Sequence, residues 1–280
     1  GDVYKRQGGI ECVKNLDDSF TVTMSIEPPE ITGDSIGIAM EGRARVDVDE
    51  DGSVNSIPIT SQIAYANAED VSAEATPRRA IVSIDRCNDC HGIVTAHGSN
   101  RTNNVQVCAT CHNANATDEG INAASVDMKV MIHGIHSSNA SFGDGADTFF
   151  EVTYPRPINQ CQACHLEGTW YPVEVPDDFR LASSTDLGLD VQDPEDDVNT
   201  TFNAAACGGC HVRLDNPDTP TDESLGNTTR AAHLMQNGSS FDVTQLIDGT
   251  LDPFTVESCT ICHGPGRTAD VGVVHADGGE

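Results

Sequence analysis

The sequence predicts a mixed fold class, in which a small antiparallel β domain precedes a domain of helices and loops with little regular secondary structure. Two observations carry this prediction. Before residue 86, apolar and polar residues alternate with a period of two, which is typical of half-buried strands. From residue 87 onward, the pattern Cys-x-x-Cys-His recurs five times and the alternation stops.

The β domain is expected to contain four short strands. Alternation predicts strands over 20–26 and around 44–48, and the pair Asp51-Gly52 that follows is typical of a hairpin turn. The apolar run over 54–59 would return from that turn, and residues 80–84 predict a last short strand.

The domain boundaries follow from these patterns. Residues 1–7 resemble a translated sequencing adaptor and are set aside, residues 8–85 form the β domain, and residues 86–280 form the second domain. We expect the β domain to be incomplete at its N-terminal side and the chain to be the C-terminal part of something longer. Cys12, the odd cysteine, is interpreted as a buried thiol or as the partner of an upstream cysteine.

The five repeated motifs predict five covalently attached haems. Two thiols one helical turn apart can add to the two vinyl groups of a haem, and the next imidazole can then reach the iron. The motifs run from Cys87 through Cys90 to His91, from Cys108 through Cys111 to His112, from Cys161 through Cys164 to His165, from Cys207 through Cys210 to His211, and from Cys259 through Cys262 to His263.

Zinc is the competing interpretation, because paired Cys-x-x-Cys units also build tetrahedral thiolate sites. Five cysteine pairs would leave one pair unmatched, and zinc gives no reason for a histidine after every second cysteine. The haem interpretation is therefore preferred.

The remaining histidines match the motifs in number. The chain has ten His, and the five outside the motifs are the candidate second axial ligands, which predicts bis-His haems: His97, His133, His136, His233 and His275. A methionine is the alternative ligand type, but the five Met lie in expected strands or beside histidines on expected helices and are interpreted as packing residues. A helix is predicted over 126–137, with His133 and His136 on one side of it, serving two different haems.

A bis-His iron has no free coordination position, so the chemistry expected is outer-sphere electron transfer and no catalytic residue is assigned. The 5% aromatic content fits a domain in which porphyrins supply the apolar bulk, and we expect that domain not to fold without them.

The net charge of −29 makes nucleic acid and anionic lipid surfaces poor partners. Solubility is the simple explanation of the charge, and attraction to cationic partners or to positively charged minerals is the alternative. Calcium is a further candidate cofactor, because acidic residues gather in loops at 177–178, at 193–197 and at Asp144 and Asp147. No membrane-spanning run and no export signal is visible in the sequence.

Several stretches beyond the motifs carry a resemblance to a known family. They include His97-Gly98, the run from Met128 to His133 with His136, Tyr154-Pro155, Ala232-His233, and the ending from Cys262 to His275. In this order along residues 85–275, the chain resembles one pentahaem half, the C-terminal one, of the outer-membrane decahaem c-type cytochromes of dissimilatory metal-reducing bacteria.

The resemblance implies a split β-barrel-like domain before the haem domain, bis-His ligation and a crossed chain of porphyrins. It also implies transfer of respiratory electrons to extracellular metal oxides, metal chelates or flavins, with terminal metal reduction as the activity. Expected partners are other multihaem cytochromes or an outer-membrane electron conduit, and the expected location is the outer-membrane surface or the cell exterior, with the periplasm as the alternative. The haem served by His97 is expected to be the one at Cys108 and Cys111.

Two other functions stay open at this point. A multihaem enzyme acting on nitrite or hydroxylamine would need an open axial position, and a conducting filament would need end-to-end contacts between copies of the chain. Neither a lysine in place of a motif histidine nor a deficit of histidines is present to favour the enzyme.

Overall fold

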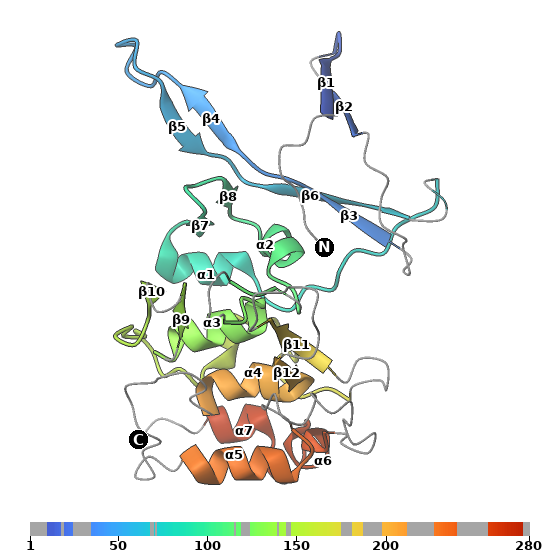
Figure 1. The fold of residues 1–280 in the computed structure, drawn as a ribbon, viewed down its shortest axis with the longest axis vertical. Coiled ribbons are helices and arrows are strands. Elements are labelled where there is room, and N and C mark those ends of the chain that lie inside the picture. The colour runs from blue at the N-terminus through green and yellow to red at the C-terminus, as the bar shows by residue number, and fades with distance from the viewer. Residues whose placement is uncertain are drawn as a thin grey trace. The chain divides into compact units, whose positions relative to one another are not determined.

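A computed structural model describes residues 10–17, 20–24, 35–67, 70, 72–114, 116–118, 124–138, 140–143, 147–174, 181–186, 198–211, 227–239 and 257–276 (Figure 1). By the contacts between its residues the chain forms two compact units, of which the first holds residues 1–40 and 63–78 and the second holds residues 41–62 and 79–280.

The first unit is built from strands. β1 (Ile10–Lys14) and β2 (Phe20–Met24) form an antiparallel pair, and β3 (Ser35–Met40) pairs with β6 (Gln62–Asn67), which begins at the boundary of the unit. Gly37 on β3 leaves room for an aromatic neighbour, because a Cβ there would lie 3.3 Å from the ring of Tyr65.

The second unit begins with the antiparallel hairpin of β4 (Arg43–Val46) and β5 (Asn55–Pro58). The hairpin is tied to the segment after the first motif, since Gly42 N donates to Asn100 O at 2.9 Å and Ser61 N donates to Thr102 O at 2.9 Å. The sequence analysis places this hairpin in the β domain, whereas its contacts group it with the motifs, and the domain boundary at residue 86 stays a prediction.

Helices dominate the rest of the second unit. They are α1 (Ile84–His91), α2 (Val105–Cys111), α3 (Met128–His136), the 3-10 helix η1 (Cys161–Ala163), α4 (Phe202–His211), α5 (Asn227–Gln236), α6 (Cys259–His263) and α7 (Val271–Ala276). α3 packs on α4, and α4 packs on α5 (Figure 1).

Three small antiparallel sheets join the loops between the helices. They are β7 (Thr95–Ala96) with β8 (Arg101–Thr102), β9 (Ser141–Phe142) with β10 (Asp147–Thr148), and β11 (Leu181–Thr185) with β12 (Val198–Thr201). The mixed class, with small antiparallel sheets and helices, is therefore confirmed. The two-domain layout stays a prediction.

Two expectations about elements differ from the structure. The strand expected over 80–84 is wrong, because only Val82 makes an isolated bridge, to His165, and α1 already begins at Ile84. The helix expected over 126–137 begins later, at Met128, because the side chain of Asp127 caps it by accepting a hydrogen bond from Lys129 N.

Little apolar surface is buried by the protein itself. Among the described residues, the buried hydrophobic side chains are those of Val107, Ala140, Ala204 and Ala205. This core is far smaller than a unit of this length normally builds. In the part of the chain that the structure describes, no helix has both the length and the apolar character needed to cross a bilayer.

Candidate haem-binding sites

The motif cysteines lie on short helices that set their spacing. Four motifs fall in or at the end of α1, α2, α4 and α6, and the third falls on η1 and the residues just after it. On a helix, residues three apart face the same side, so both thiols of a motif can reach one edge of a flat cofactor. None of the ten motif cysteines forms a disulfide.

The structure brings the ten histidines together as five pairs. Each pair joins one motif histidine to one histidine outside the motifs, with ring centroids 5.9–6.1 Å apart. The pairs are His91 with His136, His112 with His97, His165 with His133, His211 with His275, and His263 with His233.

This spacing fits one metal ion between the two rings of each pair. A bond from an imidazole nitrogen to a first-row transition metal is about 2.0–2.1 Å, and an imidazole radius of roughly 1.1 Å on each side gives about 6.3 Å between centroids. Two imidazoles in van der Waals contact alone have no reason to choose one separation five times. The residues present therefore fit iron held between two imidazoles, with the paired thiols beside it for covalent attachment.

Hydrogen bonds orient several of these rings. Nδ1 of His112 lies 2.8 Å from Val126 O, that of His136 lies 2.9 Å from Ile132 O, and that of His263 lies 2.9 Å from Ala269 O. Nδ1 of His275 similarly lies 3.0 Å from Val271 O. Because a carbonyl can only accept, Nδ1 carries the proton, and the lone pair of Nε2 is left for a metal.

Both rings of the pair His133 and His165 are half-buried. Burial lowers the pKa of His133, and burial together with the neighbouring His133 lowers the pKa of His165 to about 4. The planes of the two rings are 18° apart. Both imidazoles are consequently neutral at physiological pH, which is the form that binds a metal ion.

The motif thiols interact across motif boundaries. Cys87 interacts directly with Cys164, which raises the pKa of Cys87 and lowers that of Cys164 to about 6. Cys87 also lies within electrostatic range of Cys108, and Cys161 lies within range of Cys207.

The last link in this series joins the fourth and fifth motifs. Burial and then the charge of Cys259 raise the pKa of Cys207 to about 12. If the motifs are numbered one to five along the sequence, their interacting thiols place them in the spatial order two, one, three, four, five.

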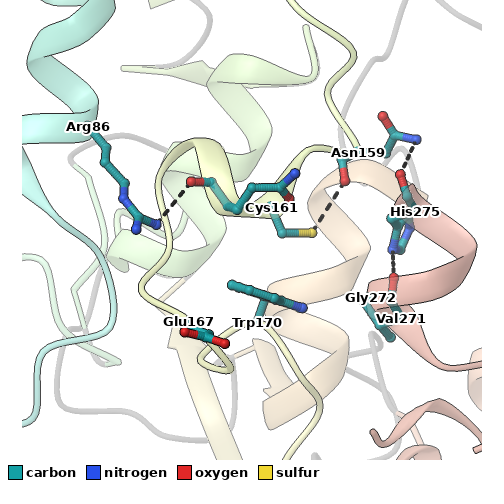
Figure 2. A pocket seen from close by; sticks show the side chains of 9 residues that line it. Arg86, Asn159, Cys161, Glu167, Trp170, Val271, Gly272 and His275 are labelled. Atoms are coloured by element: carbon teal, nitrogen blue, oxygen red, sulfur yellow. Dashed lines mark hydrogen bonds between the residues drawn. The ribbon is translucent and has the colours of Figure 1, made fainter. Parts of the chain in front are cut away.

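A cavity of about 360 Å³ opens beside the third motif (Figure 2). Trp170 provides an aromatic wall, and the thiol of Cys161 and the ring of His275 lie on its lining. Arg86 of α1 reaches the same region and donates hydrogen bonds to the carbonyl oxygens of Gln162 and His165. An apolar wall beside a haem-attaching thiol is the environment that a porphyrin face needs.

Sequence reasoning missed an acidic loop in the β4–β5 hairpin. Asp47, Asp49 and Asp51 place one carboxylate oxygen each within 4.8 Å of the others, and Gly52 N donates to Asp47 Oδ2 at 2.9 Å. The signal was the spacing Asp-x-Asp-x-Asp-Gly over 47–52, which resembles the first half of a calcium loop. The twelfth residue of such a calcium loop is a glutamate. In this chain the twelfth residue, counting Asp47 as the first, is Pro58.

Of the acidic residues first considered for calcium, only Asp147 is among the described residues. Asp147 is exposed in β10, whereas Asp144 and the acidic runs at 177–178 and 193–197 lie outside the described residues. Cys12 falls in β1, and the surroundings of its side chain also lie outside the described part of the chain.

Comparison with known proteins identifies the family. Residues 79–276 match the family described as outer membrane cytochrome MtrC/MtrF-like, domains II/IV. The chain belongs to this family. A search of the curated proteins finds no match.

Among solved structures, the chain is similar to the crystal structure of MtrC from Shewanella baltica OS185, with 18% sequence identity and a TM-score of 0.48. The likeness covers 92% of this chain and 38% of that MtrC. Membership of the family implies covalently bound haem c and a location at the outer-membrane surface or outside the cell. The predicted resemblance to outer-membrane multihaem cytochromes is thereby confirmed at the level of the family.

Proposed function

We propose that the chain is a five-haem electron-transfer unit in which every iron is held between two imidazoles. The observation that carries the proposal is the set of five mixed histidine pairs with centroids 5.9–6.1 Å apart. When bound, each haem supplies a one-electron ferric/ferrous couple. The ligands would be His91, His112, His165, His211 and His263 from the motifs, with His136, His97, His133, His275 and His233 opposite them.

The protein would attach each haem, orient its imidazole ligands and fill the remaining coordination position of the iron. The motif thiols fix each cofactor by two bonds, the Nδ1 hydrogen bonds hold the imidazoles in one tautomer, and the second imidazole fills the position where a substrate would bind. This arrangement supports outer-sphere transfer and gives no reason to expect nitrite or hydroxylamine to bind iron.

The thiol contacts support a linear order of attachment points. Cys108, Cys87, Cys164, Cys207 and Cys259 represent the second, first, third, fourth and fifth motifs, and successive motifs in this order lie within interaction range. An unbranched series suits conduction from one end of the unit to the other, because transfer between closely spaced cofactors needs no diffusing intermediate.

The acceptor and partners are proposed from the family and from charge. An outer membrane cytochrome would receive electrons from other multihaem cytochromes or from an outer-membrane conduit, and would pass them to metal oxides, metal chelates or flavins outside the cell. The net charge of −29 favours positively charged mineral surfaces or cationic partners over anionic ones. Calcium binding, the pentahaem half of a decahaem parent and the domain boundary at residue 86 stay predictions.

A spectroscopic count tests the proposal. The protein would be produced in a host with covalent haem attachment, and haem would be measured as the pyridine haemochrome against protein concentration. We expect five haems per chain and a wholly low-spin spectrum in the oxidised protein, with no change on adding cyanide or nitrite. Fewer than five haems, or a high-spin fraction that binds nitrite rapidly, would contradict the proposal and favour the enzyme.

A further inference from the structure

Glu257 lies two residues before the fifth motif and accepts hydrogen bonds at both of its carboxylate oxygens. Its Oε1 accepts hydrogen bonds from Thr201 Oγ1 at 2.6 Å, Ala204 N at 2.9 Å and Ser239 Oγ at 3.1 Å. Its Oε2 accepts from the backbone N of Asn203 at 2.7 Å and from the side-chain amide of Asn203 at 2.8 Å. Every one of these groups donates to the carboxylate, so the position of the side chain is fixed at both oxygens.

The partners that surround this carboxylate are buried. Thr201 and Asn203 are 3% exposed, Ser239 is 4% exposed and Ala204 is completely inaccessible. Glu257 itself is half-buried, so its charge is screened by water less than a fully exposed charge and its field reaches further into the protein.

The carboxylate also lies beside two haem-attaching thiols. Asn203 and Ala204 are in the first turn of α4, the helix that carries Cys207, and Glu257 itself precedes Cys259 at the start of α6. The negative charge of Glu257 contributes to the raised pKa of both thiols, after burial in each case and, for Cys207, after Cys259 as well.

We propose that Glu257 is a fixed negative charge that makes the haems of the fourth and fifth motifs the two lowest-potential haems of the chain. The proposal rests on the proposed function, since it requires that Cys207 to His211 and Cys259 to His263 each hold a bis-His haem. A nearby anion stabilises the ferric state relative to the ferrous state and so lowers the reduction potential.

A charge of the opposite sign lies beside the third motif. Arg86 donates to the carbonyl oxygens of Gln162 and His165 there. Beside the second motif, Arg101 forms a 2.5 Å ion pair with Glu41, and the two charges act on His97 in opposite directions. The low-potential end of the unit would therefore lie at the C-terminal motifs, and electrons placed there would pass downhill toward the third motif.

The test compares Glu257→Gln with Glu257→Asp in the full chain carrying all its haems. Gln keeps the shape and removes the charge, whereas Asp keeps the charge and shortens the side chain. An optical redox titration fitted with five one-electron steps should move the two lowest steps upward in Glu257→Gln. We expect about a tenfold change in the ferric-to-ferrous ratio at a fixed potential, equal to about 59 mV for one electron.

The controls separate charge from structure. Glu151→Gln removes the same charge from an exposed position between β10 and η1 and should leave all five steps in place. Glu257→Asp should leave the two lowest steps within a small fraction of the shift seen in Glu257→Gln. Equal shifts in Asp and Gln would mean that Glu257 acts only as a structural cap, and a shift of fewer than two steps, or none, would overturn the proposal outright.

A second measurement leaves Glu257 unchanged, and it tests the proposal even if the Glu257→Gln protein does not fold with all its haems. Replacing His211 or His263 by Met raises the potential of the haem concerned and so marks its step in the titration. Each marked step should be one of the two lowest in the unaltered protein, and any other position would overturn the proposal. Haem content and spin state, measured on the unaltered protein, report separately on the proposed function.

Discussion

At the scale of single residues, His133 combines a half-buried ring with a defined partner. The centroid of its ring lies 6.0 Å from that of His165, and burial lowers its pKa, so the imidazole is neutral at pH 7. Its Nδ1 is buried without a hydrogen-bond partner that meets normal geometry, although the carbonyl groups of Lys129 and Ala206 are nearby. An imidazole with a buried nitrogen of this kind is poorly placed for any role except packing or binding a metal.

Replacing His133 by Ala should open the iron at the third motif and no other. The covalent haem should remain, because Cys161 and Cys164 are unchanged, but one haem in five should become high-spin and bind cyanide. Absorption and electron paramagnetic resonance spectra would measure this. Met131→Ala on the same helix is the control and should stay low-spin. If His133→Ala stayed low-spin, the pairing with His165 would be incorrect.

Asp270 is a second residue with a distinct role, because it ties the segment after the fifth motif to the helix that carries His275. Its carboxylate accepts hydrogen bonds from Gly266 N and, at 2.8 Å, from Gly272 N, and these bonds together with that of Tyr171 lower its pKa. A group whose pKa is lower in the folded state stabilises that state above its unfolded pKa and loses the effect as the pH falls.

We therefore expect Asp270→Asn to reduce thermal stability at pH 7 and to make little difference once the pH lies well below about 4, the ordinary pKa of an aspartate. Melting temperatures of the two proteins at pH 7, 5 and 3 would measure the difference. Asp147→Asn, at an exposed position, should show no such trend. A gap between Asp270→Asn and the parent that stayed constant with pH would refute the electrostatic explanation.

At the scale of elements, α3 and α4 approach each other closely. Both variable positions of the fourth motif are glycine, and a Cβ on Gly209 would lie 2.8 Å from His133 Cβ and 3.2 Å from Gly134 N. The Oγ of Ser137 also donates to Gly209 O at 2.5 Å. α4 can approach His133 and Gly134 of α3 this closely only because position 209 carries no side chain.

Gly209→Ala should consequently push α3 away and displace His133. We expect a loss of about 1–3 kcal/mol in the free energy of unfolding, which is typical of overpacking, and a partial high-spin signal from the third motif. Denaturant unfolding and absorption spectra would measure both effects. Asp89→Ala replaces the equivalent, exposed position of the first motif and should change neither. A Gly209→Ala protein as stable as its parent would mean that the helices can separate freely.

Sequence patterns predicted an element correctly where residues close together in the chain determine its conformation. The turn pair Asp51-Gly52 does lie in the loop of the β4–β5 hairpin, and the apolar periodicity around Met128 does form a helix. The strand expected over 80–84 failed because contacts with the distant His165 segment decide its conformation. The histidine pairs could be counted from sequence, but only His97 was matched to a motif, the one that ends at His112 and lies close to it in the chain. A match such as His211 with His275 depends on how far-apart segments pack.

At the scale of the whole molecule, the described residues contain very few buried apolar side chains. Burial of apolar surface is the main favourable contribution to folding, so haems at the proposed sites would complete a core that the side chains do not. We expect the chain produced without covalent haem attachment to be largely unfolded.

Limited proteolysis and far-ultraviolet circular dichroism of the protein from a host lacking the attachment machinery would test this. The segment 79–276 should be cleaved rapidly and show little helix, whereas the haem-loaded protein should resist. The positive control is the same gene in a host with the machinery. A haem-free chain that resisted protease across the second unit would show that the side chains alone suffice to fold it.

If each ring pair binds one iron as proposed, the order of the histidines along the chain sets the order in which the irons gain their second ligand, because a chain emerges from its N-terminus. For three motifs the second imidazole comes earlier in the chain, since His97, His133 and His233 precede the motifs with which they pair. For the other two it comes later, because His136 follows His91 and His275 follows His211. A nascent product halted between residues 211 and 275 would therefore carry an iron with a vacant face, open to peroxide until the last helix arrives.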